Sequence, residues 1–206
     1  LGENGAGKTT LPRAMAGLLP AKGEALFDSK PAAAQYERIS YITGEGSYYP
    51  TLTVAEYGAL LADLNPAFDE GRYKEFLDFF SLSGKDVIGH LSTGQKARVE
   101  LAAGFGKRAA YYLMDEPFLG KDPFTRKDFI KLMSGTLRGE ETILLTTHYL
   151  EDVEHFLDRA LIVHQGRIAE DVLVDDLHES GDTLLTRMAK ACGWNPDHYL
   201  QFGSEE

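Results

Sequence analysis

The residues best suited to chemistry stand at the start of the chain, in Gly2-Glu3-Asn4-Gly5-Ala6-Gly7-Lys8-Thr9-Thr10. This run fits G-x-x-x-x-G-K-[ST], the pattern of a phosphate-binding loop. Its glycines let the backbone wrap around a polyphosphate, and successive N–H groups with the helix that follows form an anion site. Lys8 adds a positive charge for the outer phosphates, and the hydroxyl of Thr9 is an oxygen ligand of the kind that Mg²⁺ prefers. The loop therefore predicts nucleotide binding.

A second group of chemical residues follows the apolar run at 109–114, where Asp115 and Glu116 stand side by side. A buried strand would deliver Asp115 to its carboxyl end, which is where α/β sheets bind ligands. There Asp115 could hold Mg²⁺ through water, and Glu116 could act as a general base toward an attacking water. The alternative is a pair of acidic residues that cap a strand end at the surface. The phosphate loop makes us favour the catalytic interpretation.

The elements that must position these residues alternate between helix and strand, as in α/β folds. Thr53-Val54-Ala55-Glu56 is a capping box, and Gln165-Gly166 predicts a hairpin turn. Periodicity predicts helices at 8–18, 53–64, 70–80, 92–105, 122–137 and 150–157, and a helical tail from 175. Strands are predicted at 23–27, 38–42, 109–114, 142–146, 160–164 and 167–171. Residues 53–105 therefore look like a helical insertion into an α/β sheet.

Composition and charge limit the classes of function. The 206 residues suffice for one sizeable core, and the net charge of −11 argues against broad contact with nucleic acid or anionic lipid. Cys192 is the single cysteine, which rules out an intrachain disulfide and suits a reducing cytoplasm. No apolar run approaches the ~18 residues of a membrane span, so we expect any membrane function to need another chain.

The position of the phosphate loop is unusual. Such a loop normally follows a buried strand, and only Leu1 stands before it here. We therefore expect that the chain lacks an N-terminal strand or more.

Three later motifs resemble those of one family. Leu91-Ser92-Thr93-Gly94-Gln95 resembles the signature motif of ATP-binding cassette (ABC) proteins. Asp115-Glu116-Pro117, followed by Gly120 and Asp122, resembles the family's Walker B motif and D-loop, and Thr146-Thr147-His148 resembles its switch histidine. Together with the phosphate loop, these motifs keep the family's order and spacing from the first residues to about Asp171. The chain is therefore similar to the ATP-binding subunit of an ABC transporter.

The resemblance implies a fold. It would be α/β, a P-loop NTPase (RecA-like) core with an inserted helical subdomain that carries the signature. The implied organisation is a single ABC-type domain over residues 1–206, with its parts at 1–52 and 106–175 (α/β core), 53–105 (helical subdomain) and 176–206 (C-terminal helical tail).

The resemblance also implies a function. ATP and Mg²⁺ would be bound between this chain and a second cassette, identical or different, and hydrolysis would drive a separate membrane-spanning permease, with no nucleic acid partner. The subunit would be cytoplasmic, on the inner face of the membrane through the permease. Implied catalytic residues are Lys8, Glu116 and His148, and implied metal ligands are Thr9 and Asp115. Residues 2–10 would bind the nucleotide, the signature would contact the partner's ATP, and Asp122 would belong to the D-loop.

The chain departs from the family pattern after Ile42, where the family has a glutamine and this sequence has Thr43-Gly44-Glu45. Glu45 could replace that glutamine as an oxygen ligand. The aromatic residue that stacks on adenine lies upstream of the phosphate loop in the family, so we expect this chain to lack it. Taken alone, Ser92 also fits an ordinary helix cap, and His148 a surface residue.

Three other functions are open at this stage. One is an ABC ATPase that works on ribosomes or DNA without a membrane partner, which the acidic charge disfavours. Another is a P-loop kinase or other NTPase, which would have no use for the signature. The third is a nucleotide-binding module that does not hydrolyse ATP.

Overall fold

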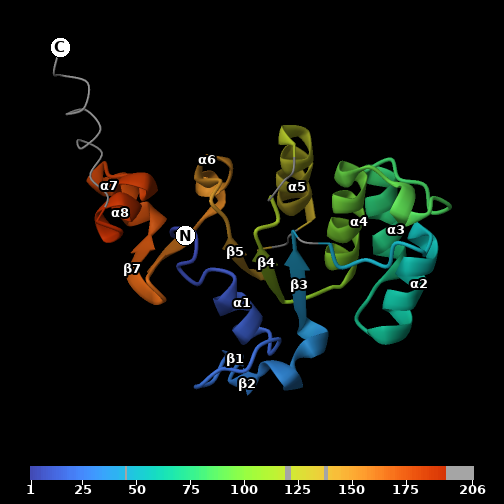
Figure 1. The fold of residues 1–206 in the computed structure, drawn as a ribbon, viewed down its shortest axis with the longest axis horizontal. Helices are drawn as coiled ribbons and strands as arrows, with labels where there is room; N and C mark the ends of the chain where they lie inside the picture. Colours follow the sequence, from blue (N-terminus) through green and yellow to red (C-terminus); the bar gives the residue numbers. More distant parts are fainter. Residues whose placement is uncertain (45, 119–121, 137–138, 194–206) are drawn as a thin grey trace, which may run out of the picture. The chain divides into compact units, whose positions relative to one another are not determined.

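The structure, a computed structural model, describes residues 1–44, 46–118, 122–136 and 139–193. The chain divides into two compact units (Figure 1). The core unit is Thr9–Thr146, and the terminal unit combines Leu1–Lys8 with the chain from Thr147 onward. Each unit has its own β-sheet and its own cluster of buried apolar residues.

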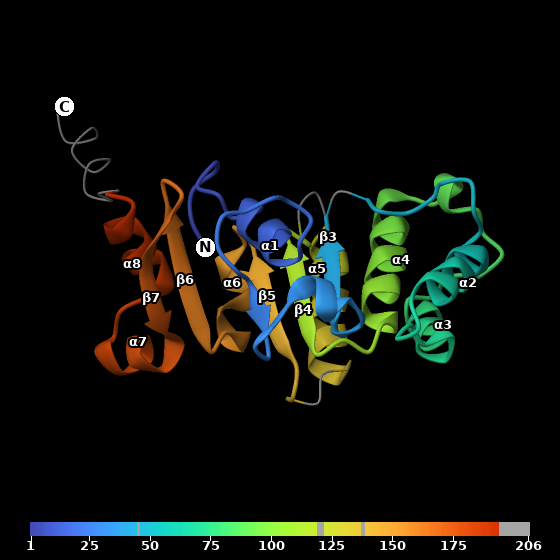
Figure 2. The ribbon, with the colours of Figure 1, turned by 90° about the horizontal axis from the view of Figure 1, so that it is seen from below.

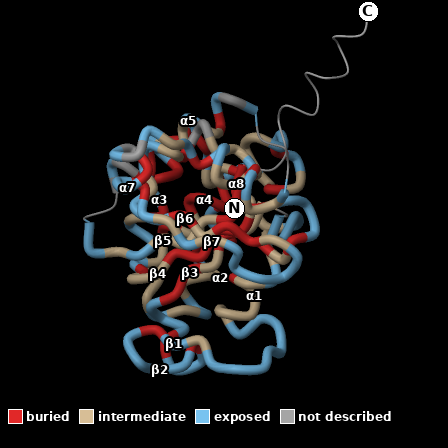
Figure 3. Tube along the Cα trace, turned by 90° about the vertical axis from the view of Figure 1, so that its left-hand side faces the viewer, coloured by how far each residue is buried: buried red, intermediate tan, exposed pale blue. Residues whose placement is uncertain are grey.

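The sheet of the core unit consists of three parallel strands. These are β3 (Ile39–Thr43), β4 (Tyr111–Asp115) and β5 (Thr142–Thr146), with β4 in the middle. Their carboxyl ends are in register, so that Thr43 pairs with Asp115 and Asp115 with Thr146. The central strand is buried from Tyr112 to Asp115, as its apolar run predicts (Figure 3). The three predicted strands are confirmed, two of them with bounds shifted by one or two residues.

Helices cover both faces of this sheet. Figures 1 and 2 show α1 (Thr10–Met15) and α5 (Pro123–Thr136) on opposite sides of β3, β4 and β5. The phenyl rings of Phe118 and Phe129 meet edge to face at 4.9 Å, and both side chains are almost completely buried. These aromatic contacts fix α5 against the core.

Three further helices confirm the predictions for 53–105. They are α2 (Val54–Leu64), α3 (Glu70–Phe79) and α4 (Thr93–Gly106). The capping box at the start of α2 is complete, because Thr53 accepts from the backbone N–H of Glu56 and the Glu56 side chain accepts from that of Thr53. The hydroxyl of buried Tyr73 in α3 donates to the carbonyl of Val54 at 2.9 Å. The treatment of 53–105 as a separate subdomain stays a prediction.

Helix α4 approaches β3 closely at Gly104. A Cβ at this position would lie 2.4 Å from Cγ1 of Ile42, well inside van der Waals contact. The hydroxyl of Ser40 donates to the carbonyl of Gly104 at 2.8 Å. One residue on, Phe105 is fully buried and its ring lies 5.1 Å from that of Tyr112. Because glycine has no side chain, Gly104 allows α4 to lie this close to the sheet.

Two predictions near the start of the core unit were too long. The helix predicted at 8–18 is α1, which begins at Thr10 and ends where Gly17 takes φ +75° and the N–H of Leu18 bonds to the carbonyl of Arg13, a Schellman-type end. The strand predicted at 23–27 is only β1 (Leu26–Phe27), paired with β2 (Lys30–Pro31). That ladder is short because Pro31 has no N–H to continue it.

The terminal unit is built on an antiparallel hairpin. Strand β6 (Arg159–His164) pairs with β7 (Arg167–Leu173), and the turn residues Gln165 and Gly166 have φ +48° and +74°, as a type I′ turn requires. The predicted hairpin is thus confirmed. A parallel bridge joins Gly2 to Val163, so the residues before the phosphate loop run beside β6.

Short helices complete the terminal unit. The helix predicted at 150–157 is a single turn, α6 (Leu150–Val153), followed by the 3-10 turn η4 (Glu154–Phe156). The predicted helical tail is α7 (Val174–Ser180) and α8 (Leu184–Ala191), and its final residues, 194–206, lie outside the described part of the chain. Leu177 and Leu184 pack with Ala160 and Val174 in one buried cluster. Among the described residues, no helix has the length and apolar character that a membrane crossing requires.

Two helical glycines give a matched test of the close approach of α4 to the sheet. Gly104→Ala should lower the free energy of unfolding by about 1–3 kcal/mol, because the new methyl group overlaps Ile42. Gly135→Ala in α5 meets nothing within 4 Å and should raise it by about 0.5–1 kcal/mol through helix propensity. Urea unfolding of both variants measures the difference, and equal shifts in the two would contradict this account of the packing.

Candidate functional site

The phosphate loop closes around the ammonium group of Lys8. Its Nζ donates to the carbonyl oxygens of Gly2 and Glu3 at 2.8 and 2.9 Å, and the residue is only 8% exposed. Gly2, Gly5 and Gly7 have φ values of +146°, +80° and +104°, which L side chains rarely adopt. The sequence pattern therefore produces the predicted tight loop, with the positive charge held at its centre.

The hairpin of the terminal unit supports this loop. A Cβ on Gly2 would lie 2.1 Å from the carbonyl oxygen of Val163, so only glycine permits the approach of the loop to β6. The N–H of Gly166, in the hairpin turn, donates to the carbonyl of Ala6 at 3.0 Å. The backbone of the loop is thus fixed at two points by β6 and its turn.

Thr9 and Thr10 follow the loop as the first residues of the core unit. Thr9 is the N-cap of α1 and already has helical backbone angles, and its carbonyl accepts a long bond of 3.4 Å from the N–H of Arg13. Arg13 lies one turn further along the helix, where its Nε is 3.5 Å from Oδ2 of Asp115. The helix therefore brings a positive charge to the acidic strand end.

Asp115 is held by several partners at the carboxyl end of β4. It is 3% exposed, and its Oδ1 accepts from the hydroxyl of Thr146 at 2.8 Å while Oδ2 accepts from the hydroxyl of Tyr41 at 3.0 Å. Burial raises the pKa of Tyr41, so its phenol stays protonated as a donor. Buried carboxylates need such donors, because an unpaired one is costly. The surface-capping alternative for this pair therefore does not describe Asp115.

Glu116 leaves the strand in an unusual conformation. Its φ of +47° is left-handed, which costs a non-glycine residue of order 1–2 kcal/mol. The N–H of Glu116 donates to the carbonyl and to the hydroxyl of Thr146, both at 3.0 Å. The strained turn is thus fixed by the neighbouring strand, and it sets Glu116 apart from the alternating pattern of β4.

The signature residues form the start of α4. Ser92 and Gln95 cap each other, since the hydroxyl accepts from the N–H of Gln95 at 3.2 Å and the Gln95 side chain accepts from the N–H of Ser92 at 3.0 Å. Leu91 is buried, whereas Ser92 and Thr93 are exposed. The expected cap is therefore present, with an exposed helix start.

Asp122 of the predicted D-loop lies beside the signature. A Cβ on Gly94 would be 3.5 Å from Oδ2 of Asp122 and 3.4 Å from Oγ1 of Thr125. Asp122 accepts from the hydroxyl of Thr125 at 2.7 Å, and this bond with the N–H groups of α5 lowers the pKa of Asp122. The structure thus brings together two motifs that are 28 positions apart in sequence, counting from 94 to 122.

The other predicted site residues either belong to the terminal unit or lie outside the described part of the chain. His148 is exposed in the terminal unit, with its ring 4.1 Å from that of Tyr149, and it belongs to a different unit from Asp115 and Glu116. Glu45, the suggested replacement for the family's glutamine, lies outside the described residues, as does Gly120.

Sequence reasoning missed three residues of the strand-end network: Arg13, Tyr41 and Thr146 as a partner of Asp115. For Thr146 a signal existed, because two adjacent parallel strands that end together place their last residues side by side. No signal in the sequence pointed to Arg13 or Tyr41, because their contacts with Asp115 depend on the packing of α1 and on the register of β3.

Comparison with known proteins shows which protein family this chain matches. A family model described as "ABC transporter" matches residues 1–119. The zinc transport system ATP-binding protein TroB of Treponema pallidum is 34% identical over 87% of this chain and 72% of its own length. The manganese transport system ATP-binding protein MntB of Bacillus subtilis is 33% identical over 82% of this chain and 72% of its own length.

A solved structure agrees with the sequence comparisons. The ATP-binding subunit of an ABC transporter superposes with a TM-score of 0.76 at 27% identity, covering 99% of this chain and 86% of the other. The agreement extends over nearly the whole chain, which supports the P-loop NTPase fold.

The threonine that bridges the two acidic residues can be tested with a matched pair in one strand. Thr146→Val removes the donor to Asp115 and should cost about 1–3 kcal/mol of stability, because a buried carboxylate loses a hydrogen bond. Thr142→Val is the same change at the exposed start of β5 and should stay within about 0.5 kcal/mol of the parent chain. Denaturant unfolding gives both values, and a Thr146→Val chain as stable as the control would refute the importance of this bond.

Proposed function

Because the chain belongs to the ABC transporter family, in which it is an ATP-binding and ATP-hydrolysing subunit, we propose that it hydrolyses Mg·ATP between two cassettes and so drives a separate membrane-spanning subunit. The proposal rests on the two acidic residues at the carboxyl end of β4 in the core unit. There a buried Asp115 and a strained Glu116 follow one another, both bound to Thr146. An acidic pair fixed in this way supports a role beyond capping a strand.

The phosphate loop supplies the positive side of the proposed site. Lys8 and the loop N–H groups bind the phosphates, with the ammonium already held by backbone carbonyls. Thr9 and Asp115 offer oxygen ligands, which fit Mg²⁺, and the existing partners of Asp115 favour contact through water. When bound, Mg²⁺ neutralises charge on the phosphate oxygens.

Glu116 serves as the general base in this proposal. Its carboxylate takes a proton from water as the water oxygen bonds to the γ-phosphorus and the bridging oxygen leaves with ADP. His148 contacts the γ-phosphate and orients that water. The left-handed backbone of Glu116 supports this role, because strain of this kind collects at functional sites.

The signature serves the ATP of a second cassette. The exposed start of α4 offers the positive end of a helix dipole, and the bare backbone of Gly94 allows a phosphate to come near. Asp122 lies next to Gly94 and takes part in the contact between cassettes.

Coupling to a membrane subunit completes the proposal and places the chain at the cytoplasmic face of the membrane. Relatives of nearly equal identity are named for different cargoes, zinc for TroB and manganese for MntB. We therefore assign the choice of cargo to the membrane subunit.

Removal of the base should separate binding from hydrolysis. Glu116→Gln should lower the rate of ATP hydrolysis by about 10²–10⁴-fold and keep ATP binding, because the amide cannot accept the proton. Glu75→Gln, the same change at an exposed position of α3, should leave both unchanged. Phosphate release and equilibrium binding of a fluorescent ATP analogue measure the two properties. A Glu116→Gln chain that hydrolyses ATP at the parent rate would exclude Glu116 as the base.

The dimer can be tested by the solution mass of Glu116→Gln, by light scattering with and without Mg·ATP. The mass should double with Mg·ATP, and adding Ser92→Arg should abolish the doubling by blocking the start of α4. Ser83→Arg, on an exposed loop, is the matched control and should leave the dimer intact. Bound ATP with a monomer mass would overturn the two-cassette arrangement while leaving ATP binding in place.

A further inference from the structure

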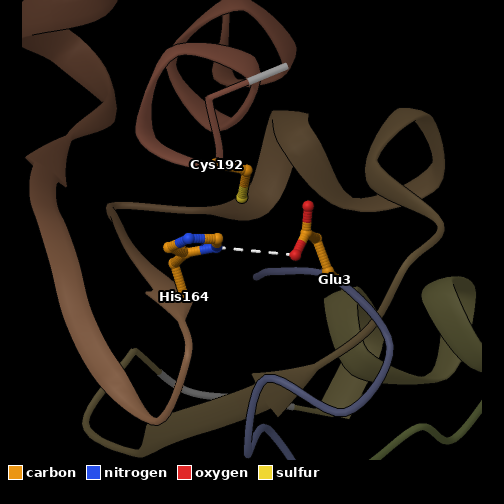
Figure 4. Close-up of side chains that lie close together, drawn as sticks. All are labelled: Glu3, His164 and Cys192. Atoms are coloured by element: carbon orange, nitrogen blue, oxygen red, sulfur yellow. Dashed lines mark ion pairs between the residues drawn. The ribbon is translucent and has the colours of Figure 1, made fainter.

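Three side chains with metal-binding chemistry meet in the terminal unit, and the proposed ATP reaction gives none of these side chains a role. A carboxylate oxygen of Glu3, a ring nitrogen of His164 and the sulfur of Cys192 all lie within 4.8 Å of one another. Figure 4 shows the sulfur of Cys192 directed toward the space between the other two side chains. The three come from parts of the sequence that are far apart, so the fold has assembled them.

Each of the three residues is carried by a well-fixed backbone. Glu3 belongs to the phosphate loop, where its carbonyl accepts from Lys8 and from the N–H of Ala6. His164 is the last residue of β6 and pairs with Arg167 across the hairpin turn.

Cys192 is the C-cap of α8, and its N–H donates to the carbonyl of Met188 at 2.9 Å. Helix α8 is tied to β6 through buried Leu184 and Ala160. The cluster therefore has the backbone support that a metal site needs.

The spacing suits a tetrahedral ion. Nitrogen and oxygen ligands about 2.0–2.2 Å from a tetrahedral zinc ion are separated by roughly 3.4 Å. The distance from Nδ1 of His164 to Oε2 of Glu3 is 3.5 Å. All separations between ligand atoms in the cluster are at most 4.8 Å, so side-chain rotations have to close the wider ones by up to about 1 Å.

The histidine has an unsatisfied atom at the centre of the cluster. Nδ1 of His164 is buried and makes no hydrogen bond within the described part of the chain. An ion pair with Glu3 at 3.5 Å is the simpler explanation, and it requires a protonated imidazole. In that explanation the sulfur of Cys192 contacts only the backbone N–H of Glu3 among the groups of the cluster, whereas a metal ion would engage the nitrogen, the carboxylate and the sulfur together.

We propose that Glu3, His164 and Cys192 bind a zinc-like divalent transition-metal ion, with water in the fourth position. A thiolate, an imidazole and a carboxylate are the ligands of zinc, whereas Mg²⁺ and Ca²⁺ take oxygen alone. An entry route exists, because Glu3 and Cys192 line an open hollow of about 260 Å³ with Leu185, Met188 and Ala189.

Such an ion would join the phosphate loop directly to α8. Glu3 contributes its carboxylate to the metal and its carbonyl to Lys8, so one residue belongs to both sites. This proposal does not depend on ATP hydrolysis, and its test uses no nucleotide.

Cobalt titration of the whole chain tests the site directly. Co²⁺ replaces zinc, and a cobalt–thiolate bond gives a charge-transfer band in the near ultraviolet. Since Cys192 is the single cysteine, such a band can arise only there. The parent chain should bind one Co²⁺ with this band and lose the band when Zn²⁺ is added. The thermal midpoint should rise with Zn²⁺ but not with Mg²⁺, because only a ligand of the folded state stabilises it.

Variants of the cluster residues test whether these side chains bind the Co²⁺. Cys192→Ser should remove the band, and His164→Gln should weaken Co²⁺ binding by at least about tenfold, since even outer-shell partners of a metal are worth that much. His155→Gln, at an exposed position outside the cluster, should bind Co²⁺ with the same affinity and the same band as the parent chain. Circular dichroism without metal checks that each variant is folded. Absence of the band in the folded parent chain, or equal Co²⁺ affinity of His164→Gln and the parent, would overturn the proposal.

Discussion

One hydroxyl group connects the two acidic residues of the core unit. Oγ1 of Thr146 donates to Asp115 and accepts from the N–H of Glu116, so a single side chain satisfies a buried carboxylate and fixes the strained turn after it. The arrangement requires the parallel strands β4 and β5 to end in register, with Asp115 opposite Thr146. The chemistry proposed for Glu116 thus depends on the pairing of two strands, because a shift of one residue would turn Thr146 to the other face of the sheet.

Helix α4 combines two structural requirements. At its start, reciprocal capping by Ser92 and Gln95 fixes the signature, and Gly94 lies against Asp122. Near its end, Gly104 lets the helix contact β3. Because both requirements are met by one continuous helix of 14 residues, the signature has a defined place in the core unit, set by the contact between α4 and the sheet.

Sequence reasoning predicted most of the fold, because the strongest signals were local. The capping box at Thr53, the helix cap at Ser92, the buried strand before Asp115 and the hairpin turn at Gln165-Gly166 are each encoded within a few residues. Errors occurred where tertiary contacts decide: α1 and β1 are shorter than predicted, and the contacts of Arg13 and Tyr41 with Asp115 depend on packing. The meeting of Glu3, His164 and Cys192 was also invisible in sequence, since it joins the loop, a strand end and a helix end. The roles of the site residues and the domain boundaries stay predictions.

The environment of Lys8 has a consequence for the energetics of anion binding. Its ammonium is buried and bonded to two loop carbonyls, so the loss of side-chain entropy and of water has already occurred during folding. An arriving phosphate meets a charge that is preorganised, and its binding energy is not consumed in ordering that side chain. The folding free energy of the terminal unit, supplied in part by the apolar cluster around Leu177 and Leu184, therefore contributes indirectly to affinity at the loop.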